Sequence, residues 1–222
     1  MLKLIIGNKT YSSWSMRGWL ACRQSGLAFE EQVVPLYDGA WIDRRASESF
    51  APSSGKVPIL WDGELVVWDS LAILEHLNDA TGNTRFWPAD PAARAMARSV
   101  VAEMHSSFAA LRNACPMKIG RVLPAQPLAD EVAADVARIQ RLWAQARGRF
   151  GGTGDFLFGE FGAADIMFAP VVMRFVTYSV PVSRFASAYI DAITEQPFVQ
   201  DWIADAQAEE WVIDRYEGPV QN

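Results

Sequence analysis

The sequence changes character at a short segment, residues 81–91 (TGNTRFWPADP), where polar turn residues are followed by two prolines. Before this segment, short apolar runs typical of strands alternate with stretches of helical spacing, whereas only helical patterns follow it. Because a strand needs other strands as partners, any sheet must come from the first segment alone. We therefore expect an α/β domain at residues 1–80, a linker at 81–90 and an all-α domain at 91–222.

Within the first domain the pattern predicts the order β-α-β-(α)-β-β-α. The run KLIIG is typical of a short buried strand, and the helix after it ends at Gly26, a residue suited to a helix C-cap. A second strand, FEEQVV, precedes a weak helical turn at residues 41–47. Two apolar runs then flank Asp62-Gly63, a dipeptide that strongly indicates a β-hairpin. A helix over DSLAILEHLNDATG completes the predicted domain.

The second domain is predicted to consist of helices alone. Amphipathic spacing indicates one long helix at residues 91–114 and another at 128–150. Further helices are expected at residues 163–178, 183–194 and 197–206.

Charge and apolar patterning exclude several classes of partner. The net charge of −6 comes from 20 basic and 26 acidic residues spread over both domains, which argues against nucleic acid and anionic membranes. The longest apolar region carries Asp165 and Arg174, so it indicates a core helix rather than a membrane span. The first apolar run is too short for a secretory signal, so a cytoplasmic protein is expected.

The two cysteines, Cys22 and Cys115, form no metal-binding spacing, and the chain holds only two histidines. We therefore expect no metal site. In a reducing cytoplasm the two thiols are best interpreted as small, buried apolar groups rather than as a disulfide.

The most unusual polar feature is a cluster of hydroxyls in YSSWS, residues 11–15. Ser12 or Ser13 stands where the first helix is predicted to begin, so its side chain can act as an ordinary N-cap. The same place offers free backbone N–H groups and the positive end of the helix dipole, which favour a bound anion. Arg17, one turn later, can add positive potential or lie at the surface as arginines usually do.

Two further motifs follow in the same domain. Lys56-Val57-Pro58 opens a predicted strand; a trans proline is the commoner state there, and a cis bond is the alternative. A cis bond would leave the backbone groups of Val57 free to pair with an extended ligand. Asp69-Ser70 can cap a helix, and the same pair can hold an amino-acid group. The Asp69 carboxylate would then bind the ammonium of the ligand, and the hydroxyl and backbone N–H of Ser70 would bind its carboxylate.

Taken in order, SSWSMR, KVPIL and WDSLAILEHL resemble the N-terminal, thioredoxin-like domain of cytosolic glutathione transferases. The SSxSxR run is most similar to the serine-type, zeta-like class, here as a bacterial member. In the second domain, LFGEFGAADIMFAP resembles the helix-capping segment of that family. Gly162 stands where the family usually has Ser or Thr, so Asp165 is expected to cap the helix alone. The resemblance covers nearly the whole chain and implies the glutathione transferase fold.

The resemblance implies that glutathione binds along the first domain as a co-substrate. Asp69 and Ser70 would hold its γ-glutamyl group, Val57 beside Pro58 would pair with the cysteinyl backbone, and Lys56 would reach the glycyl carboxylate. Ser12, flanked by Ser13, would donate a hydrogen bond to the sulfur and stabilise the thiolate. Ser13, Ser15 and, less well placed, Tyr11 remain the alternatives for this role.

A second substrate is expected between the domains, where clefts commonly form. Met104, Phe108 and Arg112 would share one face of the predicted long helix, with His105 beside them as a possible proton donor. Such a stripe is more often part of a core than of a site.

The resemblance implies a homodimeric glutathione S-transferase that attacks a small electrophile, as in detoxification. The alternatives are a glutathione-dependent isomerase of the maleylacetoacetate type, a reductive dehalogenase, and a non-catalytic glutathione-binding or regulatory protein of the same fold.

Overall fold

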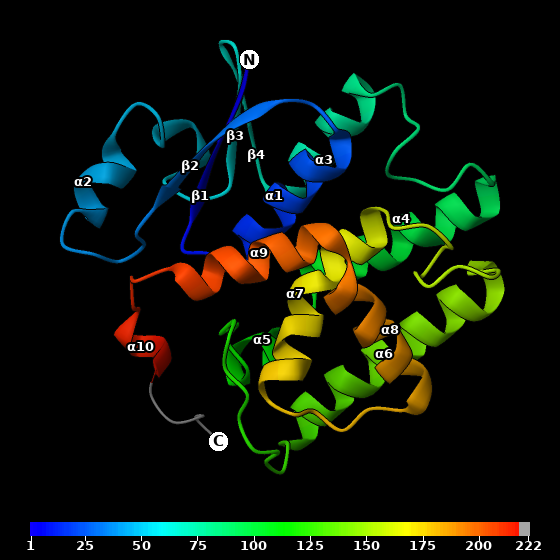
Figure 1. Cartoon of the computed structure of the whole chain (residues 1–222). Coiled ribbons are helices and arrows are strands. Elements are labelled where there is room, and N and C mark those ends of the chain that lie inside the picture. Colours follow the sequence, from blue (N-terminus) through cyan, green and yellow to red (C-terminus); the bar gives the residue numbers. More distant parts are fainter. Residues whose placement is uncertain (218–222) are drawn as a thin grey trace.

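The computed structural model describes residues 1–217 and begins with a four-stranded mixed sheet (Figure 1). Its strands are β1 (Leu2–Gly7), β2 (Phe29–Val34), β3 (Ile59–Asp62) and β4 (Leu65–Trp68), in the spatial order β2-β1-β3-β4. β1 and β2 are parallel, while β3 is antiparallel to both β1 and β4. The predicted hairpin is confirmed, with Gly63 at a φ of 62° in the turn, where an L side chain would be strained.

Successive side chains of β1 point to opposite faces of the sheet, and helices pack against both faces. Leu4 and Ile6 belong to the large core that includes α1 (Ser13–Ser25) and α3 (Ser70–Ala80). Ile5 points the other way, into a smaller cluster with Trp41 of α2 (Trp41–Ala46). A short 3₁₀ turn, η1 (Ala51–Ser53), connects α2 to the cis-proline loop before β3. The sheet is therefore covered on both sides, as the period of two requires.

Within the described residues the second domain consists of helices and loops, with isolated β-bridges only at residues 156–160, so the predicted combination of an α/β domain and an all-α domain is confirmed. Its helices are α4 (Pro91–Ser106), α5 (Ala109–Ala114), α6 (Asp130–Phe150), α7 (Ala163–Thr177), α8 (Arg184–Glu195), α9 (Pro197–Ala208) and α10 (Asp214–Glu217). Figure 1 shows α7 in the middle of this domain and α9 running alongside α1. Among residues 1–217, no helix combines the length and apolar character needed to cross a bilayer. Cys22 and Cys115 are free and buried, as expected.

The prediction of one continuous helix at residues 91–114 was wrong. Helix α4 ends at Ser106, and Phe108 adopts a left-handed φ of 66° before α5 begins. The Arg112 guanidinium folds back and donates hydrogen bonds to the carbonyls of Met104, His105 and Ser107. These bonds satisfy carbonyl groups that the end of α4 leaves without a partner inside the helix. The break turns the chain, so the predicted face of Met104, Phe108 and Arg112 does not exist.

Buried polar contacts connect helix α1 to the second domain. Arg17 is 1% exposed, and its Nε donates to the carbonyl of Met167 in α7 at 3.0 Å. The interpretation of Arg17 as a surface arginine was therefore wrong. Arg174 of α7 donates from Nη2 to the hydroxyl of Ser13 at 3.2 Å. Burial, together with the positive Arg112 and Arg174 nearby, lowers the pKa of Arg17.

Helix α7 begins with an acidic cap that receives help from the linker. Asp165 is buried; its carboxylate accepts from the N–H of Gly162 at 3.0 Å, the N–H of Leu157 at 3.1 Å and the hydroxyl of Tyr189 at 2.9 Å. Burial raises the pKa of Asp165 to about 6, against the opposing effect of these three donors. The next N–H, that of Ala163, donates to the carbonyl of Phe86 at 2.8 Å. The expectation that Asp165 caps the helix alone was therefore wrong.

Candidate functional site

A cavity of about 700 Å³ lies on the first domain, at the start of α1 and beside the β4–α3 junction. The motifs that stood apart in the sequence meet on its wall. The predicted residues that line it are Ser12, Lys56, Val57, Pro58, Asp69 and Ser70. The fold therefore brings the three motifs of the first domain to one place.

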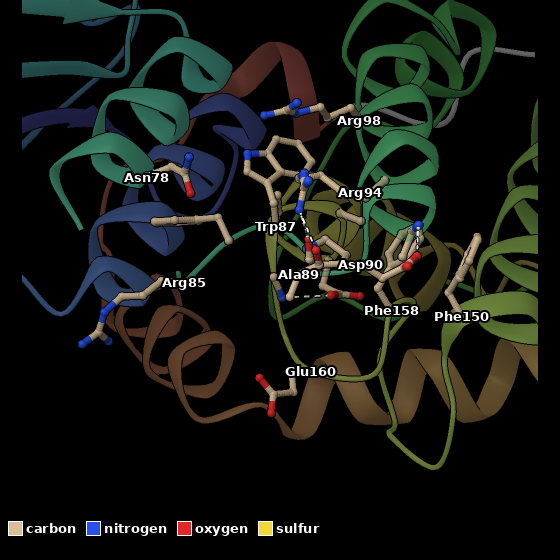
Figure 2. Close-up of a pocket in the computed structure, with 18 of the residues that line it drawn as sticks. Asn78, Arg85, Trp87, Ala89, Asp90, Arg94, Arg98, Phe150, Phe158 and Glu160 are labelled. Carbon is tan, nitrogen blue, oxygen red and sulfur yellow. Dashed lines mark hydrogen bonds between the residues drawn. The ribbon is translucent and has the colours of Figure 1, made fainter. Parts of the chain in front are cut away.

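A second cavity, of about 780 Å³, lies at the linker between the domains and is shown in Figure 2. Two of its charged side chains are bound within the protein: Arg94 donates from Nη1 to the carbonyls of Pro88 and Ala89 at 3.0 and 2.8 Å, and Asp90 accepts from the N–H of Ala93 at 2.7 Å. None of the predicted site residues lines it. The cavity at α1 is therefore the candidate functional site.

Ser12 is the N-cap of α1 and also faces this cavity. Its Oγ accepts from the N–H of Ser15 at 3.3 Å, and no acidic residue lies in the first turn of the helix. Of the alternative serines, Ser13 turns its hydroxyl to Arg174, while Ser15 is fully buried. The cap and the anion-favouring helix end therefore coincide at Ser12.

Tyr11 and the cysteines are poorly placed to stabilise an anion in the cavity. The Tyr11 hydroxyl donates to Glu217 at 2.7 Å, and burial together with Glu217 raises the pKa of Tyr11 to about 12. Burial also raises the pKa of Cys22 to about 12. Neither Tyr11, Cys22 nor Cys115 lines the cavity.

The Val57-Pro58 peptide bond is cis. Of the two states considered from the sequence, the less common one is therefore observed. The Pro58 ring packs against α1 at Gly18, where an added Cβ would stand 2.8 Å from the Pro58 Cγ. A glycine is therefore needed inside α1 for the loop to approach the helix. Lys56, exposed, stands next to this loop on the cavity wall.

Asp69 is the N-cap of α3 and carries a left-handed φ of 70°. Its Oδ1 accepts from the N–H of Leu71 at 2.8 Å, and its Oδ2 lies 3.3 Å from Nε2 of His105 in α4. Partial burial opposes ionisation, but the contacts with His105 and Leu71 and the positive charge of Arg17 outweigh it. The pKa of Asp69 is therefore lowered, and its carboxylate stays charged at neutral pH.

Ser70 is the clearest sign of a missing partner. Its side chain is buried, lines the cavity and has no hydrogen-bond partner for Oγ among the described residues. A buried hydroxyl without a partner costs free energy, roughly 1–3 kcal/mol, unless something binds to it. Ser70 is also the first residue of α3, where free N–H groups favour an anion.

Sequence reasoning missed a second group of residues in the cavity lining. Trp41 of α2 lines the cavity, and its Nε1 is buried without a hydrogen-bond partner within residues 1–217. Arg45, one turn later, lies with its guanidinium 5.9 Å from the Trp41 ring, and Tyr37 completes this group. The only signal in the sequence was the weak helical turn at residues 41–47, which gave no indication of where the side chains point.

None of the four residues predicted for a second substrate lines the cavity. Met104 and Phe108 are buried, and Arg112 is bound to the carbonyls at the end of α4. Trp14 lines the cavity instead. The centroid of its ring lies 4.7 Å from the Arg17 guanidinium, 5.1 Å from the Arg112 guanidinium and 5.2 Å from the centroid of the His105 ring.

The lining of the cavity therefore offers several positions for charged groups. Asp69 can accept an ammonium, Ser70 and the start of α3 can bind a carboxylate, and Ser12 can donate to an anion. Lys56, Arg45 and the Trp41 indole offer donors for a second carboxylate. This arrangement suits a short peptide that carries an amine and two carboxylates, with an anionic centre between them.

Two family models match the chain. The model described as the glutathione S-transferase N-terminal domain matches residues 11–80, and the one described as the C-terminal domain matches residues 129–205. Together they cover most of the chain. A curated relative, glutathione S-transferase 1 of Dianthus caryophyllus, is 25% identical over 182 residues, which are 79% of this chain and 78% of the relative.

Solved structures show the same fold. A Burkholderia glutathione transferase homolog with bound glutathione has a TM-score of 0.70 at 21% identity, over 94% of this chain and 99% of the other. The Omega 2S glutathione transferase of Trametes versicolor has a TM-score of 0.68 at 19% identity, over 93% and 95% of the two chains. The sheet, the helical domain and both family models lead to one conclusion: this chain belongs to the glutathione S-transferase family of enzymes.

Proposed function

We propose that this protein is a glutathione transferase that binds glutathione in the cavity at α1 and activates it as a thiolate for attack on a small electrophile. The observation that carries this proposal is the pair formed by the charged Asp69 carboxylate and the unpartnered Ser70 hydroxyl. An amino-acid end group satisfies both at once, and the γ-glutamyl end of glutathione is such a group.

The rest of the peptide follows the cavity wall. The backbone of Val57, next to the cis proline, pairs with the cysteinyl residue in the manner of an added strand. The glycyl carboxylate then meets Lys56, with Arg45 and the free Nε1–H of Trp41 in the same lining. The Trp41 indole N–H, which has no partner among the described residues, thereby gains one.

Ser12 would donate a hydrogen bond to the sulfur. A free thiol has a pKa of about 8.5, so only a few per cent is thiolate at neutral pH. A hydroxyl donor at a helix N-terminus stabilises the thiolate, and each unit of lowering corresponds to about 1.4 kcal/mol. Ser12 keeps its own proton throughout. The serine-type interpretation is supported by the positions of Tyr11 and the two buried thiols, all of which lie outside the cavity.

The test of the binding site is the Asp69→Ala variant, measured by calorimetry with glutathione. Loss of the carboxylate is expected to weaken binding by roughly 10-fold or more, since hydrogen bonds to charged groups contribute about 1.5–3 kcal/mol. Asp90→Ala is the matched control, because Asp90 is also an aspartate N-cap, of α4, and lies outside this cavity. Equal affinities of Asp69→Ala and the unaltered protein would refute the proposed site.

The test of the chemistry is turnover of glutathione with aryl halides, α,β-unsaturated acids, peroxides and mixed disulfides. A transferase should consume at least one electrophile, and Ser12→Ala should lower kcat/KM by roughly 10-fold or more. Binding of glutathione without turnover of any of these classes would favour a binding protein instead.

A further inference from the structure

Behind Ser12 lies a second serine that does not face the cavity. Ser15 is completely buried, and its Oγ is 2.7 Å from the Oγ of Ser12. The N–H of Gly7, the last residue of β1, donates to the same Ser15 Oγ at 3.0 Å. A backbone N–H, a buried hydroxyl and a hydroxyl at the cavity wall therefore form one continuous chain.

The proton of Ser12 points along this chain, because Ser12 donates to Ser15. To stabilise a thiolate in the cavity, Ser12 must instead point that proton at the sulfur and donate a hydrogen bond to it. When the Ser12 hydroxyl turns to the sulfur, Ser15 can turn its own hydroxyl to donate to the Ser12 Oγ, because the contact between the two oxygens is unchanged and Gly7 still donates to Ser15. Each oxygen then keeps a donor, and both hydroxyl protons are used.

We infer that Ser15 is a positioning residue for thiolate stabilisation: it orients the Ser12 hydroxyl toward the sulfur and polarises it through the N–H of Gly7. This inference rests on the proposed function of Ser12. Hydrogen bonds in a chain strengthen one another, by roughly 10–30% per bond, and burial of Ser15 excludes competing water. A lone Ser12 would keep only the 3.3 Å bond from the Ser15 N–H behind it.

A purely structural role makes a different prediction. If Ser15 only ties the end of β1 to the start of α1, its removal lowers the stability of the fold but does not change the acidity of a bound thiol. The pKa of bound glutathione therefore separates the two roles, whereas stability or activity alone does not.

The experiment is a pH titration of the thiolate ultraviolet absorbance of glutathione bound to the full chain. Ser15→Ala is compared with Ser12→Ala and with Ser25→Ala, and thermal unfolding verifies that each variant is folded. Ser25 is the matched control: it lies at the other end of α1, is buried, and its Oγ accepts from the N–H of Leu27 at 3.1 Å. Ser25→Ala thus removes an equivalent hydroxyl from the same helix, away from the cavity.

We expect Ser15→Ala to raise the pKa of the bound thiol by roughly half a unit, Ser12→Ala by roughly one unit, and Ser25→Ala to leave it unchanged. Ser15→Thr, which keeps the hydroxyl, should restore the original value. A shift with Ser12→Ala but none with Ser15→Ala would overturn this inference and leave the proposed function standing. No shift with Ser12→Ala would overturn the role of Ser12 and this inference with it.

If Ser15→Ala does not fold, Ser15→Cys provides the same contrast with Ser15→Thr, because a thiol fills the space and donates poorly. A raised pKa in the cysteine variant alone would support the inference, and equal values in the two variants would contradict it.

Discussion

The carbonyl oxygen of Phe86 lies 2.6 Å from the point where a Cβ would stand on Gly162. The same oxygen accepts from the N–H of Ala163, the first residue of α7. The linker thus takes the place that a serine or threonine side chain occupies in the usual capping box. Gly162 is required here because backbone, rather than a movable side chain, fills the space.

Gly162→Ser should therefore destabilise the protein, although serine is the better N-cap in isolation. Overpacking against the Phe86 carbonyl is expected to lower the free energy of unfolding by roughly 1–3 kcal/mol. Urea denaturation measures this effect. Gly148→Ser is the control, since a Cβ at Gly148 in α6 meets nothing within 4 Å. A Gly162→Ser protein as stable as its parent would contradict the assigned role of Phe86.

The buried carboxyl of Asp165 should leave a signature in the pH dependence of stability. Its pKa is about 6 in the folded state against 3.8 as the ordinary value, so the folded state binds a proton before the unfolded state does. The free energy of unfolding therefore gains a contribution as the pH falls from about 6 to about 4, and loses it as the pH rises through 6. The full contribution is roughly 3 kcal/mol.

Asp165→Asn should lack this contribution, because an amide does not titrate. The difference between the parent and Asp165→Asn in urea denaturation should therefore widen toward pH 4, in favour of the parent. Parallel pH profiles of the two proteins would show that Asp165 has an ordinary pKa in the fold.

A comparison of the two histidines tests whether His105 of α4 supports the Asp69 carboxylate. Each lies against a carboxylate: His105 is 3.3 Å from Asp69, and His76 is 3.1 Å from Asp62 in the hairpin. Since His105 helps to hold the carboxylate proposed for the γ-glutamyl ammonium, His105→Ala should raise the KM for glutathione by roughly 3-fold to 10-fold. His76→Ala should leave that KM as it is. Steady-state kinetics at a fixed concentration of electrophile would show it, and equal KM values for the two variants would exclude His105 from the site.

Two tryptophans allow a similar comparison at the position proposed for the glycyl carboxylate. The Nε1 atoms of Trp41 and Trp61 are both buried without a hydrogen-bond partner in the described chain, but only Trp41 lines the cavity. Replacement by phenylalanine removes the N–H and keeps an aromatic ring. Trp41→Phe should weaken glutathione binding in calorimetry by roughly 3-fold to 30-fold, and Trp61→Phe should not. If the two variants bind alike, the Trp41 indole does not contact the ligand.

The fold was predictable wherever one local rule decided the structure. Asp62-Gly63 specified the hairpin, and Gly26 ended α1 in a left-handed C-cap. The rules failed at residues 106–109, where helical spacing continues but the helix does not. That break depends on Arg112 reaching back to the carbonyls of α4, a contact that residue spacing does not reveal.

The candidate site divides in the same way. Ser12 and Asp69 could be identified because they are also helix caps, with a sequence signal of their own. Trp41 was missed, and Ser15 was named only as an alternative to Ser12. What distinguishes them is an indole N–H without a partner in the described chain and a hydrogen bond to the end of β1, and both depend on how the elements pack. Arg17 was misjudged for the same reason: composition favours exposure, while α7 buries it.

The burial of Arg17 beneath α7 limits how this protein can be taken apart or recombined. A first domain produced alone would expose a guanidinium that has its carbonyl partner in Met167, and a foreign helical domain without a matching carbonyl would bury the charge unpaired. The two halves are therefore not interchangeable modules. Substitutions that alter the docking of α7 will reach the cavity at α1 through that helix, so the domains are expected to have changed together rather than separately.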